Sequence, residues 1–336
     1  MSLFLALILA IAFGSPSEVV SKIGFGSCMH QDDPQVFWQV ISKKKPDFFI
    51  LLGDNIYAKS ISEKKMAYSK LDSKSTFSDF RKSVPIYAIW DDNDYGTSDS
   101  GAEFPFKKES KELFLDFFKV PKNSVRWGRD GIYDAVTFGP KTKKVQLLLL
   151  DTRTFRSQPQ KSYDLNPIKR YVPNNDPKTS MLGEAQWQWL EEKLKEPANI
   201  RIIASGLQIL PTQHQFESWN NFPHERKKMI ELINKTNASG VILLSGDRHK
   251  ASIMKISEGV KYPVYEVTSS GLTQTRPRKG EDEPDTFRVG SIYYGPNFGF
   301  INIDWEKATL ELQILSESGE SQLHQLLNIN DLTRLR

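Results

Sequence analysis

The amino-acid sequence predicts an α/β fold in which helices lie outside a largely parallel sheet. Short runs of consecutive apolar residues alternate with stretches that carry apolar residues at helical spacing. The runs suit strands buried on both faces, and the spaced stretches suit helices with one buried side. Strands that alternate with helices favour parallel pairing, because each helical crossover returns the chain to the same end of the sheet.

Each predicted strand ends abruptly in a polar or glycine-containing turn. The six runs are Ile23 to Phe25, Asp47 to Leu52, Pro85 to Trp90, Val145 to Leu150, Ile202 to Ala204 and Val241 to Leu244. Helices are predicted over Pro34 to Lys44, Ser110 to Lys119 and Glu184 to Lys195. Because no helical pattern separates the later segments, we predict antiparallel strands over Val264 to Thr268, Val289 to Tyr294, Gly299 to Asp304 and Thr309 to Ile314.

Composition indicates a folded protein with a mixed-sign surface. Of the 336 residues, 39% are hydrophobic and 26% are charged, which is enough apolar material for a sizeable core. The net charge of +4 arises from 45 basic and 41 acidic residues spread along the chain. This balance lacks the concentrated basic patch that nucleic-acid binding requires, so no nucleic-acid partner is expected.

The N-terminus predicts export. Residues Leu3 to Phe13 are apolar and end at Gly14-Ser15-Pro16, a pattern typical of a signal peptide over residues 1–16. The run is shorter than the roughly 20 residues of a membrane-spanning helix. We therefore predict a secreted, lumenal or periplasmic protein with no membrane span after cleavage and one domain over residues 17–336. An uncleaved anchor and a buried first strand are the alternatives.

Carboxylates follow several of the predicted strands. Asp54, the run Asp91-Asp92-Asn93-Asp94, Asp151 and Asp247 all stand at strand ends. Such ends meet at one edge of a parallel sheet, where so many carboxylates would repel one another unless they bound a cation. Oxygen ligands suit iron, calcium, manganese or magnesium. A helix N-cap is the alternative for any single Asp, but it does not explain four such turns.

Four ordered motifs resemble the PhoD-like branch of the metallophosphoesterases. They are Gly26-Ser27-Cys28, Gly53-Asp54, Trp90-Asp91-Asp92-Asn93-Asp94 and Gly246-Asp247-Arg248-His249. Weaker matches include Asp151-Thr152-Arg153, Gly183-Glu184-Ala185-Gln186-Trp187 and Thr268-Ser269-Ser270-Gly271-Leu272-Thr273. The resemblance spans about residues 21 to 304 and implies a four-layer α/β/β/α sandwich of mixed sheets, with a metal site at the strand ends.

The resemblance also implies a dinuclear metal centre, with iron plus calcium expected and other divalent metals as the alternative. Asp54 would bridge the two ions. The implied iron ligands are Cys28, Tyr57 and His249, and the implied ligands of the second ion are Asp92 and Asp247. Each residue also has a structural alternative: a lone cysteine is often a small buried hydrophobe, Tyr57 could be a packed aromatic, and His249 could be a core or surface histidine.

By the same resemblance, the metals would activate water as a hydroxide that attacks phosphorus, with Arg248 and less surely Arg153 contacting the phosphate oxygens. One position departs from the family motif: Asn93 stands where the family has a histidine that can protonate the leaving group. Asparagine cannot supply that proton. His214 is the favoured substitute acid, His30 is another candidate, and His214 could instead be structural.

The predicted function is therefore that of a secreted, metal-dependent phosphoesterase acting on small phosphate mono- or diesters. The alternative from another class is a secreted pseudoenzyme that keeps the metals and binds a phosphorylated partner, which Asn93 favours. A nuclease finds no basic groove in support. The sequence identifies no protein partner.

Overall fold

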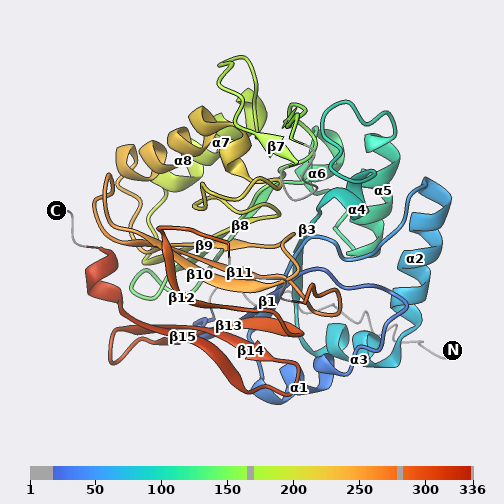
Figure 1. Ribbon diagram of the computed structural model, residues 1–336. Helices are drawn as coiled ribbons and strands as arrows, with labels where there is room; N and C mark the ends of the chain where they lie inside the picture. The colour runs from blue at the N-terminus through green and yellow to red at the C-terminus, as the bar shows by residue number, and fades with distance from the viewer. Residues whose placement is uncertain (1–17, 165–169, 278–282, 334–336) are drawn as a thin grey trace, which may run out of the picture.

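The computed structural model describes residues 18–164, 170–277 and 283–333, so the predicted signal peptide lies outside the described residues. Two mixed β-sheets form the centre (Figure 1). In order, the six-stranded sheet contains β15 (Ser321–Asn328), β14 (Thr309–Ser316), β13 (Asn297–Asp304), β1 (Lys22–Gly26), β2 (Phe48–Leu52) and β3 (Ile86–Ile89). The seven-stranded sheet contains β12 (Arg288–Tyr293), β10 (Ala251–Ile256), β11 (Val264–Ser269), β9 (Val241–Ser245), β8 (Ile200–Ser205), β5 (Val145–Leu149) and β4 (Asp134–Phe138).

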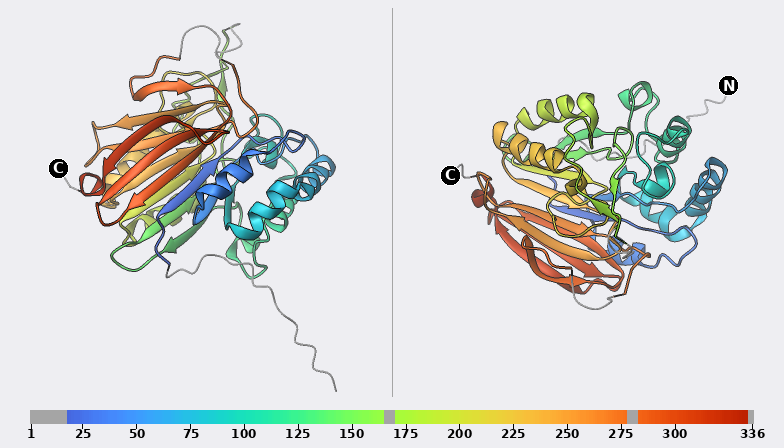
Figure 2. Two further views of the ribbon diagram at one scale, coloured as in Figure 1. Left: turned by 90° about the horizontal axis from the view of Figure 1, so that it is seen from below. Right: turned by 45° about the horizontal axis from the view of Figure 1, so that its top comes forward.

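Helices lie outside both sheets, but the left view of Figure 2 shows the red strands β13, β14 and β15 without a helix over them. One group is α1 (Phe37–Lys44), α2 (Ile61–Ser73), α3 (Ser75–Ser83), α4 (Asp92–Tyr95), α5 (Lys107–Phe117) and α6 (Val125–Gly128); the other is α7 (Gly183–Lys195), η1 (Trp219–Asn221) and α8 (Pro223–Lys235). Trp38 of α1 packs on Phe80 of α3 and Phe49 of β2, with ring centroids 4.6 and 5.3 Å away. The predicted four-layer α/β/β/α sandwich is thus confirmed.

The residue pattern's prediction of one largely parallel sheet is wrong, because the strands divide between two mixed sheets. β1, β2 and β3 are parallel in the first sheet, and β5, β8, β9 and β11 are parallel in the second. The later strands are antiparallel except for β11, which also pairs in parallel with β9. A strand buried on both faces has the same apolar pattern in either sheet, so the pattern could not assign the sheets.

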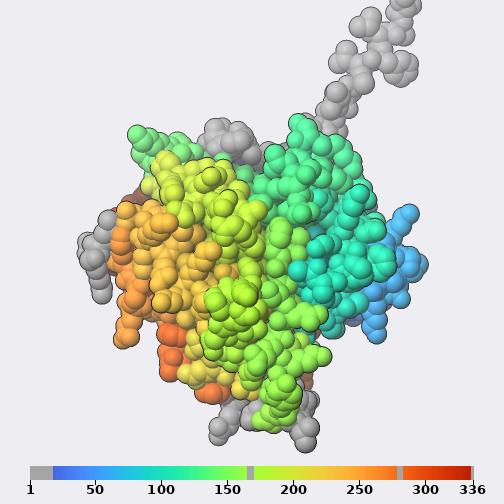
Figure 3. Space-filling view, turned by 90° about the horizontal axis from the view of Figure 1, so that it is seen from above, coloured from blue at the N-terminus to red at the C-terminus, as the bar shows by residue number. Residues whose placement is uncertain are grey.

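Several elements were not predicted from the residue pattern. They are α2, α3, α4, α6, η1, α8, β4, β10, β15, η2 (Ile329–Leu332) and the small hairpin of β6 (Gln160–Lys161) and β7 (Tyr171–Val172). In the space-filling view of Figure 3, the light green and yellow residues that follow β5 lie between teal residues around α5 and gold residues around α8. No described helix is long and apolar enough to cross a membrane.

The two sheets approach closely where their strands end. A Cβ added to Gly246, after β9, would lie 2.7 Å from Ser27 Oγ and 2.9 Å from the Leu52 carbonyl oxygen, both beside the other sheet. Contacts this short exclude any side chain. Gly246 N also donates to Gly206 O at 3.0 Å. Glycine at this turn therefore allows the turns after β1, β2 and β9 to meet.

Candidate metal centre

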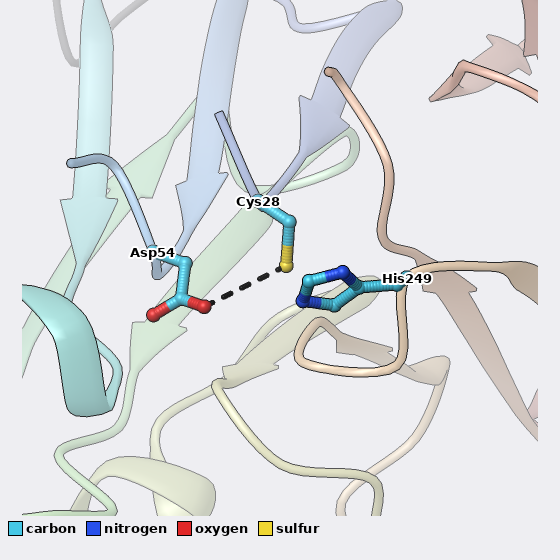
Figure 4. Close-up of side chains that lie close together, drawn as sticks. All are labelled: Cys28, Asp54 and His249. Carbon is cyan, nitrogen blue, oxygen red and sulfur yellow. Dashed lines mark hydrogen bonds between the residues drawn. The ribbon is translucent and has the colours of Figure 1, made fainter. Parts of the chain in front are cut away.

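The turns after β1, β2 and β9 bring together three predicted ligands (Figure 4). Donor atoms of Cys28, Asp54 and His249 all lie within 4.8 Å of one another. Cys28 Sγ is 3.9 Å from Asp54 Oδ2 and 3.1 Å from Ser270 Oγ. A thiol, a carboxylate and an imidazole with this convergence form a set that could hold a transition metal.

Four residues of these turns have positive φ angles although none is glycine. The angles are 61° at Cys28, 50° at Asp54, 66° at Asp247 and 55° at His249. This conformation is uncommon for residues with side chains, and such strain tends to cluster at functional sites. Hydrogen bonds hold it, including His249 N to Ser270 Oγ at 2.7 Å and Met29 N to Asp54 O at 2.9 Å.

Asp54 also belongs to a second group of donors. Its carboxylate, with those of Asp91 and Asp92, forms a set whose ligand atoms lie within 4.8 Å of one another. All three residues are buried. Burial, followed by repulsion from Asp92 and Asp91, raises the pKa of Asp54 well above its ordinary value. A bound cation would remove this repulsion and favour the ionised carboxylates.

Asp91 is a candidate metal ligand that was not predicted from the sequence. Arg153 Nε donates to Asp91 Oδ1 at 2.6 Å, while Asp91 Oδ2 is buried and has no hydrogen-bond partner among the described residues. Burial raises the pKa of Asp91 to about 8 although Arg153 opposes the shift. The signal was present in the Asp91-Asp92 pair of the motif, but position alone did not show which carboxylate faces Asp54.

Tyr57 and His249 have properties that suit ligands. The Tyr57 hydroxyl is buried and has no hydrogen-bond partner among the described residues, and burial followed by Asp54 raises its pKa well above the ordinary value. Its ring lies 6.5 Å from that of His249 and stacks on His30 at 5.2 Å. Burial, then Arg276, lowers the pKa of His249 to about 4, so its imidazole is neutral near pH 7.

Asn93 contacts two carboxylates of the second group. Its Nδ2 donates to Asp92 Oδ1 at 2.9 Å and to Asp54 Oδ2 at 3.1 Å, and its backbone N donates to Asp54 Oδ1 at 3.2 Å. Asp247 is in neither group, but burial, together with repulsion from Asp92, raises its pKa to about 6 although Arg248 opposes the shift. Its role as a ligand remains a prediction.

Arg153 is paired with carboxylates inside the protein, and its contact with phosphate remains a prediction. Its side chain is fully buried and forms ion pairs with Asp91 at 2.6 Å and Glu217 at 3.0 Å. Arg156 pairs with the same Glu217 at 2.9 Å. Two carboxylates thus engage Nε and Nη1 of Arg153, while its Nη2 has no hydrogen-bond partner among the described residues.

The remaining predicted catalytic residues lie beside the donor groups. Arg248 Nη2 donates to Glu283 Oε1 at 2.7 Å, and its guanidinium covers the Phe216 ring at 4.5 Å. His214 lines a small hollow with Lys250 and Glu283, and its Nε2 has no hydrogen-bond partner among the described residues. Burial, then Arg248, lowers the pKa of His214 well below its ordinary value, so a neutral His214 is a poor proton donor near pH 7.

A third group of carboxylates adjoins the second. Donor atoms of Asp92, Asp99 and Glu217 lie within 4.8 Å of one another, and Asp99 N donates to Asp92 Oδ2 at 2.8 Å. Asp99 was not predicted from the sequence, and no role at the site was predicted for Glu217, because neither follows a predicted strand. Their contacts depend on loops whose paths no local pattern indicates.

This fold, with donors from both sheets converging at the strand ends, defines a protein of the metallophosphoesterase type. Residues 23–314 match the profile of the PhoD-like phosphatases, and the chain belongs to this family. It is 23% identical over 326 residues to alkaline phosphatase D of Bacillus subtilis (strain 168), a match that covers 83% of this chain and 54% of the relative. The chain thus spans about half the length of that curated relative.

Two solved structures share the fold. A structure of PhoD matches with a TM-score of 0.72 and 16% identity, covering 95% of this chain and 72% of that one. The purple acid phosphatase PPD1 from yellow lupin (Lupinus luteus) seeds matches with a TM-score of 0.64 and 14% identity, covering 93% of this chain and 54% of that one. At these identities the likeness concerns the fold alone.

Proposed function

We propose that this protein is a metal-dependent phosphoesterase that hydrolyses small phosphate mono- or diesters. The observation that carries the proposal is the position of Asp54, whose carboxylate belongs to both the group with Cys28 and His249 and the group with Asp91 and Asp92. A carboxylate shared by two donor groups is suited to bridging two ions. Membership of the PhoD-like phosphatases supports the phosphoesterase class.

The residues fit two different ions. Cys28, His249 and the unpartnered Tyr57 hydroxyl provide sulfur, nitrogen and phenol donors, which suit iron. Asp91 and Asp92 provide only carboxylate oxygens, which suit a harder ion such as calcium, and Asp247 would complete this side. Bound ions of this kind supply water of lowered pKa as the nucleophile and neutralise phosphate charge.

Side chains of the protein would then orient the substrate. Asn93 Nδ2 donates to Asp92 Oδ1 at 2.9 Å and to Asp54 Oδ2 at 3.1 Å. It would exchange one of these hydrogen bonds for one to a phosphate oxygen of the substrate. Asparagine donates no proton to the leaving group. The reaction should therefore favour leaving groups that depart as stable anions.

Turnover of methyl p-nitrophenyl phosphate tests the proposal. We expect activity that a strong chelator abolishes and that added metal restores, together with loss of activity and of both metals in Asp54→Asn. Asp304→Asn is the matched control, because it makes the same substitution at a carboxylate in neither donor group, which accepts from the backbone N–H groups of Glu306 and Lys307. If Asp54→Asn kept full metal content and activity within about tenfold of the parent, Asp54 would be excluded from the centre. A tenfold change corresponds to about 1.4 kcal/mol in the barrier.

Export and a single folded unit over residues 17–336 are further parts of the proposal. The apolar run from Leu3 to Phe13 supports export. N-terminal sequencing of protein recovered outside the cytosol should begin near residue 17. Recovery with residue 1 intact would contradict a cleaved signal peptide.

A further inference from the structure

Beside the candidate metal centre, one carboxylate pairs with two positively charged side chains. Glu283 accepts from Arg248 Nη2 at 2.7 and 3.0 Å, and its Oε2 lies 2.7 Å from Lys250 Nζ. Burial opposes ionisation of Glu283, but Arg248 and Lys250 outweigh it and lower its pKa to about 2. The carboxylate is therefore charged at neutral pH, and the three groups together carry one positive charge.

This trio is within electrostatic reach of the proposed ligands. Arg248 stands between Asp247 and His249 in the chain, and its charge acts to lower the pKa values of both. The Arg248 side chain is only 5% exposed and covers the ring of Phe216 at 4.5 Å. Glu283 and Phe216 together hold the guanidinium in one place.

Two other arginines near the donor groups are also paired with carboxylates. Arg153 pairs with Asp91 and Glu217, and Arg156 pairs with the same glutamate. Arg276, exposed at the rim, acts to lower the pKa of His249. Arg248 and Lys250 would therefore add a large increment of positive charge if their shared carboxylate were removed.

We propose that Glu283 is a specificity-determining residue that limits how strongly the site attracts doubly charged phosphate groups. Its charge offsets those of Arg248 and Lys250, which weakens the attraction of both side chains for the second charge of a monoester, although Arg248 Nε has no hydrogen-bond partner among the described residues. The inference rests on the proposed function. Neutralising Glu283 should favour dianionic ligands over monoanionic ones, because attraction grows with the charge of the ligand.

Glu283→Gln tests this role, since glutamine keeps the size and an acceptor oxygen but removes the charge. We expect kcat/KM for p-nitrophenyl phosphate, relative to methyl p-nitrophenyl phosphate, to rise about fivefold, and less at high salt. The two esters share a leaving group and differ by one charge. Asp285→Asn is the matched control, because that carboxylate in the same loop accepts from the backbone N–H groups of Phe287 and Thr212.

Equal changes for both esters, or the same ratio change in Asp285→Asn, would overturn the proposal and leave Glu283 a structural residue. If the parent hydrolyses neither ester, the proposed function fails, and the role of Glu283 is tested by phosphate binding instead. Calorimetry with inorganic phosphate and metal-loaded protein should then show about fivefold tighter binding in Glu283→Gln. Unchanged phosphate affinity would refute the role independently of catalysis.

Discussion

Replacing Asn93 by histidine tests how the leaving group departs. The Asn93 amide lies 2.9 Å from Asp92 Oδ1 and 3.1 Å from Asp54 Oδ2, so a side chain here lies beside two of the candidate metal ligands. An asparagine amide donates hydrogen bonds but gives up no proton at useful pH. An imidazole in the same place, beside two carboxylates, would keep its proton more strongly than a free histidine.

The expected gain follows from the chemistry that Asn93 lacks. General acid catalysis contributes about 10²- to 10⁴-fold when the acid is well placed. No neighbouring residue in the described part of the chain is arranged to orient the new imidazole, so we expect the rate for alkyl esters to rise by only about tenfold. This corresponds to about 1.4 kcal/mol in the barrier. Nitrophenyl esters release a stable anion without protonation, and their rates should change by less than about twofold.

The assay compares kcat for a dialkyl phosphate and for methyl p-nitrophenyl phosphate in the parent, Asn93→His and Asn93→Gln. The effect should appear in kcat, because the proton moves in the transition state. The rate of Asn93→His with the alkyl ester should also fall at high pH, as the imidazolium loses its proton. Metal content is measured in each variant, so that ligand loss is separated from acid catalysis.

Equal acceleration of both esters would refute the reasoning and make Asn93 a substrate-binding residue. Fast alkyl turnover in the parent would show that another acid already acts. The low pKa of His214 makes that residue a weak candidate, and His214→Ala would decide it. Absence of turnover before and after the change, in metal-loaded protein, would favour a pseudoenzyme.

Three further predictions concern metal and stability. Cys28→Ser should keep the fold but lose one metal, iron by our proposal, because a hydroxyl is a poorer ligand than thiolate; unchanged metal analysis would make Cys28 a packing residue. Burial raises the folded-state pKa values of Asp91 and Asp247 to about 8 and about 6. Their contribution to stability is present below about pH 4 and is lost as pH rises to about 8, so the Tm of chelated protein should fall across this range while metal-loaded protein resists the fall. Arg153→Leu should lower the free energy of unfolding in urea by about 3–5 kcal/mol, because Asp91 remains buried without its partner and Glu217 keeps one of its two arginine partners, Arg156; a loss under about 1 kcal/mol would contradict this account.

The sequence predicted the parts of the site that depend on strand ends. The runs ending near Cys28, Asp54 and Asp91 form β1, β2 and β3, because consecutive apolar residues are buried on both faces of a strand. The ordered motifs then identified the family. The pattern could not show that Asp247 follows a strand of the other sheet.

The partners of the arginines were beyond prediction for a different reason. Glu217 lies 64 residues from Arg153, and Glu283 lies 35 residues from Arg248. Both glutamates stand in loops outside the predicted elements, where no periodic pattern fixes which charges meet. The motif of Arg153 indicates a location near the site but not the carboxylates that pair with its side chain, and its contact with phosphate remains a prediction.

A bound cation would relieve both the backbone strain and the charge repulsion at the candidate metal centre. The positive φ angles of Cys28, Asp54 and His249 each cost about 1–3 kcal/mol. Relaxing one turn alone is hindered, because Gly246 leaves no space between the turn after β9 and Ser27 on the neighbouring sheet. A cation held by all three side chains would stabilise the strained turns and remove the penalty on buried Asp54 at once. Metal affinity and fold stability should therefore be linked in this protein, because the same junction of two sheets determines both.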